Sequence, residues 1–229
     1  TQTIASGGSA DSTVISASGN QIVSGGASVT SASLLSGGTQ TLLSSAAVLR
    51  TTVNAGAVQS VGSTASATST TLSGGTQTVS GGAVLSTLIN SAGVANILAG
   101  GNASATTVNS GGIENVASGG ASLAATLYSA GQQNVLSLGI ASGATLSGGT
   151  QTIASGGSAD ATVISASGNQ IVSGGASVTS ASLLSGGTQT LLSSAAVLRT
   201  TVNAGAVQSV GSTASATSTT LSGGTQTVS

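Results

Sequence analysis

The chain has 229 residues, of which two are basic and three acidic, and it contains one tyrosine and no His, Cys, Met, Trp, Phe or Pro. Acid–base catalysis, nucleophilic catalysis and tight metal binding need His, Cys, Lys, Asp or Glu side chains held together, so we expect no enzyme, cofactor or metal site. A nucleic-acid partner is equally excluded, because it requires many Lys and Arg contacts and often aromatic platforms.

Aliphatic residues distinguish the chain from a flexible linker. Mixtures of Gly, Ser, Thr and Ala usually bury too little apolar surface to offset chain entropy. Here Val, Ile and Leu recur throughout, and the mean hydropathy is positive. No apolar run approaches the roughly 20 residues of a transmembrane helix, so we do not expect this segment to span a membrane.

A long internal repeat organises the sequence. Residues 1–80 recur as residues 150–229, an offset of 149, and the only difference is Ser12 against Ala161. We therefore expect one full long unit over residues 1–149 and a partial second copy over residues 150–229. Both should belong to one continuous solenoid.

A shorter repeat runs inside the long unit. Its marker position returns every 18 or 19 residues, and eight repeats fill 149 residues. The marker residues are Gln2, Gln21, Gln40, Gln59, Gln77, Ala95, Glu114 and Gln133.

Two short strands are predicted in each repeat. The first follows the marker and carries an aliphatic column at Ile4, Val23, Leu42, Val61, Val79, Ile97, Val116 and Val135. Ser-Gly-Gly segments then predict turns, because glycine accepts a positive φ. The second strand carries a further column at Ile15, Leu34, Val53, Leu72, Ile89, Val108, Leu127 and Leu146. Period-two alternation surrounds both columns, as expected for strands.

Coils of this size can bury a core only by stacking on one another. The predicted fold is therefore all-β, a parallel β-solenoid with about 18–19 residues per coil. At the strand spacing of about 4.8 Å, eight coils advance about 38 Å, which describes a rod. A helical fold is disfavoured by the Gly, Ser, Thr and Val content, and collagen by the absence of proline and of glycine at every third residue.

The repeat motif resembles a known family. The segment Gly-Gly-Thr-Gln-Thr-Val-Ser-Gly-Gly-Ala at residues 74–83, followed by Ser-Thr-Leu-Ile, is similar to the AIDA-type repeats of bacterial autotransporter adhesins. The resemblance covers the whole chain. It implies a right-handed β-helix at the bacterial cell surface or in the extracellular matrix, self-association of passengers on neighbouring cells and, in some relatives, O-glycosylation of Ser or Thr.

Two columns of residues are predicted to point outwards from the strands and to form a candidate lateral-contact face. The residues proposed for this face are Thr52, Thr71, Thr107, Thr126, Thr145, Asn96, Asn115 and Asn134. Flat, uncharged faces of this kind could dock against another rod or match ice. The simpler interpretation is that β-branched polar residues suit the outer side of a strand.

The remaining polar residues have structural interpretations. We expect the marker glutamines to form an amide ladder along one edge of the solenoid, each side chain bonding its neighbour one coil away. Asp11 and Arg50 should lie two coils apart, too far for an ion pair. Tyr128 is expected to project outwards.

The sequence favours a structural adhesin or matrix fibre whose rods associate with one another, laterally or end to end, in cell aggregation, biofilm formation or surface attachment. Host or matrix surfaces are additional candidate partners. A passive stalk that projects a terminal binding domain is the main alternative, and an ice-binding solenoid is a weaker one.

Overall fold

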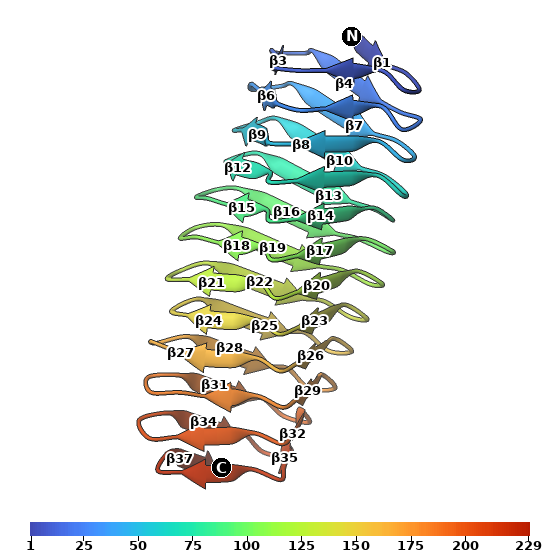
Figure 1. The fold of residues 1–229 in the computed structure, drawn as a ribbon. Coiled ribbons are helices and arrows are strands. Elements are labelled where there is room, and N and C mark those ends of the chain that lie inside the picture. The colour runs from blue at the N-terminus through green and yellow to red at the C-terminus, as the bar shows by residue number, and fades with distance from the viewer.

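A computed structural model describes residues 1–229 as an all-β parallel solenoid of about 12 coils with about 19 residues in each. The coils stack along one axis, and the two termini lie at opposite ends of the rod (Figure 1). Every strand pairs in parallel with the equivalent strand of the next coil, and the strands form three sheets that we name A, B and C. No segment has the length and apolar character of a membrane-spanning helix.

Sheet A contains the strands that carry the marker residues, most of them four residues long. Its strands are β1 (Gln2–Ile4), β4 (Asn20–Val23), β7 (Thr39–Leu42), β10 (Val58–Val61), β13 (Thr76–Val79), β16 (Val94–Ile97), β19 (Ile113–Val116), β22 (Gln132–Val135), β25 (Thr150–Ile153), β28 (Asn169–Val172), β31 (Thr188–Leu191), β34 (Val207–Val210) and β37 (Thr225–Val228).

Sheet B contains shorter strands of two or three residues. They are β2 (Ser9–Ala10), β5 (Ser28–Val29), β8 (Ala47–Leu49), β11 (Ser66–Thr68), β14 (Ala83–Leu85), β17 (Asn102–Ser104), β20 (Ala121–Leu123), β23 (Ile140–Ser142), β26 (Ser158–Asp160), β29 (Ser177–Thr179), β32 (Ala196–Leu198) and β35 (Ser215–Thr217).

Sheet C carries the second aliphatic column. Its strands are β3 (Thr13–Ile15), β6 (Ala32–Leu34), β9 (Thr51–Asn54), β12 (Thr71–Ser73), β15 (Leu88–Ile89), β18 (Thr107–Val108), β21 (Thr126–Tyr128), β24 (Thr145–Ser147), β27 (Val163–Ser165), β30 (Ser182–Leu183), β33 (Thr201–Asn203) and β36 (Thr220–Ser222).

Each coil therefore has three strands, whereas the sequence predicted two. The strand that was missed belongs to sheet B and directly follows the first glycine turn, as β14 follows Gly82. Only its central residue points into the core, and this residue is usually Ala or Val, as in Ala67 and Val84. A single small inward residue per strand gives almost no alternation to detect.

The corner between sheets B and C explains why this strand was overlooked. It is made by one residue in the left-handed region, and in most coils that residue is not glycine: φ is 58° at Arg50, 57° at Ser69 and 54° at Ala105. The chain thus turns sharply without the glycine that usually marks such a position.

A glycine pair makes the turn between sheets A and B in several coils, whereas Ser45 and Thr64 take the positive φ in others. Gly100 has a φ of 71°, and a Cβ on Gly101 would stand 2.5 Å from the carbonyl oxygen of Val79 in the coil before. The first glycine of the pair therefore permits the backbone conformation, and the second permits the close approach of stacked coils.

The core consists of stacked columns of like residues. One cluster of 42 buried hydrophobic residues runs along the rod and includes both predicted aliphatic columns except Val116, which is also buried; Ile97 and Leu127 are examples, each 0% exposed. The sheets continue without a break past residue 149, since Thr150 of β25 pairs with Gln132 of β22. The core is therefore one-dimensional, and each coil is buried only by its neighbours.

Candidate interaction surfaces

The predicted lateral-contact residues lie on two sheets. Thr52, Thr71, Thr107, Thr126 and Thr145 point outwards from sheet C, whereas Asn96, Asn115 and Asn134 point outwards from sheet A. All eight are partly exposed. The predicted set is therefore divided between two faces of the rod, because the sequence did not show that the two outward columns belong to different sheets.

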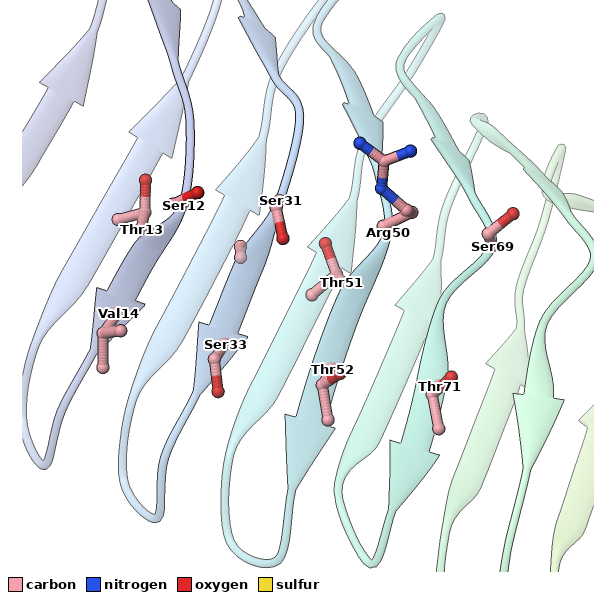
Figure 2. Close-up of a pocket in the computed structure, with 11 residues that line it drawn as sticks. Ser12, Thr13, Val14, Ser31, Ser33, Arg50, Thr51, Thr52, Ser69 and Thr71 are labelled. Carbon is pink, nitrogen blue, oxygen red and sulfur yellow. The ribbon is translucent and has the colours of Figure 1, made fainter.

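The threonine column of sheet C is not continuous. Leu88 stands between Thr71 and Thr107, and Val163 follows Thr145. A shallow hollow near the N-terminal end of this sheet includes Thr52 and Thr71, with Arg50 at the adjoining corner (Figure 2). Its lining is mainly hydroxyl groups, and it contains no carboxylate.

The asparagine column of sheet A forms a short outer ladder. The Nδ2 atom of Asn115 donates a hydrogen bond to Oδ1 of Asn96 at 2.9 Å, and Asn134 donates to Asn115 at the same distance. These side chains are half-buried against their neighbours. Much of their hydrogen-bonding capacity is therefore used within the rod.

The marker glutamines form the predicted amide ladder, but it runs through the interior of the solenoid and not along an edge. Nε2 of Gln40 donates to Oε1 of Gln21 at 2.6 Å, and Gln59 donates to Gln40 at 2.7 Å. All three side chains are 0% exposed. Threonine hydroxyls directly before the strands of sheet C join this ladder, as Thr70 donates to Gln59 at 3.3 Å. Buried amides are tolerated because each finds a partner one coil away.

The ladder is interrupted at two neighbouring coils. Ala95 supplies no amide, and Glu114 is a fully buried carboxylic acid in the next coil. Oε2 of Glu114 accepts hydrogen bonds from Ser122 at 2.9 Å and Gln133 at 2.6 Å, while Oε1 of Glu114 and Oγ1 of Thr106 have no partner. Burial raises the pKa of Glu114 above its usual 4.5, against the lowering effect of these hydrogen bonds.

The other charged groups are scattered. Asp11 follows β2 and Arg50 follows β8, which lies two strands further along sheet B. The two residues are therefore two coils apart, as expected. Asp160 accepts a hydrogen bond from Thr179 at 2.6 Å. No group of three or more His, Cys, Asp or Glu side chains that could hold a metal is present. Tyr128 projects outwards and is 49% exposed.

The outer face of sheet B was not anticipated from the sequence. Leu49, Leu85 and Leu123 are 38%, 48% and 51% exposed on this face. The signal that could have shown it is a repeated triplet with Ala first and Leu last, at 47–49, 83–85 and 121–123. Such a triplet places Ala and Leu together on the outer side of a three-residue strand.

Comparison with solved structures identifies the family. The chain is 39% identical to the fragment described as "Crystal structure of TibC-catalyzed hyper-glycosylated TibA55-350 fragment", with a TM-score of 0.96, over 100% of this chain and 84% of that one. The chain belongs to the AIDA-type autotransporter adhesins. No family model and no curated protein sequence matches this adhesin. The structural match agrees with the repeat resemblance and with the β-solenoid fold.

Proposed function

We propose that this adhesin is a structural component of the bacterial surface or extracellular matrix, and that its rods adhere to one another side by side. The observation that carries the proposal is the outer surface, which has long rows of hydroxyl, amide and aliphatic groups and almost no charge. Many weak contacts repeated along a rod can add up to stable association.

Low charge has a direct physical role in such a rod. Stacked coils repeat each outward side chain at about 4.8 Å, so a charged column would repel itself. A neutral surface also lets two rods approach without electrostatic repulsion. Both effects favour a surface made for lateral contact.

The experiment that tests self-association has two parts. Cells that display the adhesin should settle faster than cells without it, and the purified chain should form dimers or larger species in analytical ultracentrifugation. A chain that stays monomeric at millimolar concentration and does not promote cell settling would end the proposal.

A passive stalk is the second candidate, favoured by the unbroken pairing of all three sheets from β1 to β37. A rigid rod of this kind could hold a binding domain away from the cell. Deleting one 149-residue unit should then shorten the reach by about 38 Å and leave ligand affinity unchanged. Ice binding has less support, because Leu88 and Val163 interrupt the threonine column.

Glycosylation is proposed from the related TibA fragment, which was hyperglycosylated by TibC. Exposed hydroxyl groups are abundant in the turns of this adhesin, among them Ser6, Ser44, Ser45 and Thr64. Intact mass spectrometry of these 229 residues, released from native material, should give a mass above the unmodified 20.9 kDa. A native segment of the unmodified mass would contradict this proposal.

A further inference from the structure

From β5 to β20 the outer face of sheet B is striped with a period of two coils. Each strand presents two outward residues, and these form one row across the face. The row is apolar on β8 (Ala47 and Leu49) and on β14 (Ala83 and Leu85). It is polar on β11, between them (Ser66 and Thr68). The alternation continues with Asn102 and Ser104 on β17 and with Ala121 and Leu123 on β20. At about 4.8 Å per coil, apolar rows recur about every 10 Å.

The two outward columns of this face differ in size. The column at the beginning of each strand holds small residues in β8, β14 and β20, and the column at the end holds leucine in the same strands. Because the central residue of each strand points inwards, a shallow groove runs along the rod axis between the two outward columns. From β5 to β17 residues of both columns line this groove. An equivalent groove lies over β29, β32 and β35 in the second copy of the long unit.

We propose that two copies of this chain associate through sheet B, parallel and in register, about a two-fold axis that runs along the rods. The proposal rests on the self-association proposed above and names its surface and geometry. Such an axis exchanges the two columns across the face but leaves each coil at its own height. Leu85 of one rod then faces Ala83 of the other, and the reverse contact forms at the same coil.

This arrangement matches like rows with like rows. Leucine from each rod enters the groove beside the small residue of its partner, so the apolar rows bury one another. The polar rows between them place hydroxyl groups opposite hydroxyl groups, where they can exchange hydrogen bonds. The outward residues from β5 to β23 include no charged side chain, so no ion is desolvated there. Over all 12 strands the charged groups in line with the outward columns are Asp11, after β2, and Asp160, at the end of β26, and the two-fold axis places Asp160 opposite Ser158 of the other rod.

The area of the face fits this proposal. Sheet B has 12 strands. At about 4.8 Å per strand and about 3.3 Å for each of three residues, the face measures about 58 by 10 Å. Two such faces bury about 1,200 Å² in total, the lower limit for a specific interface. A chain of one and a half long units should therefore dimerise weakly, and longer arrays should dimerise more strongly.

The first test compares two variants that add the same charge to different faces. Leu85→Asp with Leu123→Asp changes sheet B, and Thr107→Asp with Thr126→Asp changes sheet C. All four side chains point outwards, and thermal unfolding of each variant checks the fold. We expect the sheet B variant to weaken dimerisation at least tenfold in analytical ultracentrifugation and the sheet C variant to leave it within about threefold.

The second test fixes the register and uses the absence of native cysteine. Chains with Ala83→Cys are mixed with chains with Leu85→Cys and treated with a short bismaleimide. Cross-linked heterodimers are expected, because these positions face each other. Chains with Ala83→Cys mixed with Leu123→Cys should react poorly, because two coils displace the sulfur atoms by about 10 Å.

The outcomes separate this inference from the function on which it rests. If the native chain is monomeric, both the proposed self-association and the sheet B interface are contradicted. A native dimer that is weakened by the sheet C variant and not by the sheet B variant overturns the sheet B interface and keeps self-association. The third outcome is a dimer that depends on sheet B but in which the Ala83→Cys and Leu123→Cys pair cross-links as well as, or better than, the Ala83→Cys and Leu85→Cys pair. This outcome would overturn the parallel, in-register geometry.

Discussion

At the scale of single residues, the carboxyl group of Glu114 is the one buried titratable group. It occupies a position that glutamine fills in most other coils, and its Oε1 atom lies in the core without a partner, as does Oγ1 of Thr106. Elsewhere in the chain Nε2 of Gln170 donates to Oγ1 of Thr162 at 3.2 Å, with the same spacing of eight residues. A protonated Glu114 could donate to Thr106 in the same way, whereas a carboxylate can only accept from the Thr106 hydroxyl.

We therefore predict that the free energy of unfolding falls as the pH rises. Burial raises the pKa of Glu114 in the folded chain, so the folded state binds the proton more tightly than the unfolded state. The resulting stabilisation is fully present below the unfolded value near 4.5 and is lost as the pH rises through the folded pKa. Thermal or denaturant unfolding between acid and neutral pH measures this dependence.

The matched variant is Glu114→Gln, which can donate to Thr106 at any pH. It should stabilise the chain at neutral pH by about 1–3 kcal/mol, because the neutral amide puts no charge into the core, and should flatten the pH profile. Asp11→Asn removes an exposed carboxylate and should leave the profile unchanged. An identical pH profile in Glu114→Gln and the native chain would contradict the assignment.

The corner residues between sheets B and C give a second prediction at this scale. Ala105 has a φ of 54°, and Gly143 occupies the equivalent position two coils later. Ala105→Gly should raise the free energy of unfolding by about 0.5–1 kcal/mol. The substitution relieves the strain of an alanine held at positive φ, and this gain exceeds the cost of the greater conformational entropy that glycine gives the unfolded chain. Ala121→Gly, in β20, is the control and should lower stability by a similar amount. Chemical denaturation measures both, and a destabilised Ala105→Gly would contradict the prediction.

At the scale of elements, the sequence identified the strands of sheets A and C but not those of sheet B. The strands around Val79 and Leu72 were predictable, since a large aliphatic residue recurs there in every coil. Sheet B has a three-residue strand with one small inward residue, and its corner needs no glycine. The amide ladder was predicted by spacing, but its burial was not, because period two shows which residues share a side and not which side is inside.

The interior position of the ladder leads to a prediction at this scale. Gln189 accepts a hydrogen bond from Gln208 and donates one to Gln170. Gln189→Ala leaves both neighbours with unpaired buried groups and a cavity, and it should destabilise the chain by about 2–5 kcal/mol. Gln132→Ala is the control at an exposed glutamine outside the ladder and should change stability by less than about 1 kcal/mol. Equal effects of the two substitutions would show that the ladder adds little to stability.

At the scale of the whole molecule, a rod of identical units has properties that add along its length. Each coil contacts only its neighbours, so stability and surface both grow in steps of one unit. The chain carries a net charge of −1 on 229 residues, so the lateral contacts proposed above would not depend on ion pairs. The fold and the surface are thus two consequences of the same stacked repeat.

Repetition predicts how association depends on length. Chains of one and of two complete 149-residue units present the same rows, but the longer chain buries about twice the area when it dimerises, and the entropy of bringing two rods together is lost only once. The dimer association constant should therefore rise more than tenfold with the second unit, as measured by analytical ultracentrifugation. The association constant should change less than about threefold between low and high NaCl concentrations, since there are few charges to screen.

If end-to-end contacts dominated, both lengths would associate equally, because each chain has the same two ends. A length series in which every unit carries the sheet B substitutions is the control, and its association constant should stay low at all lengths.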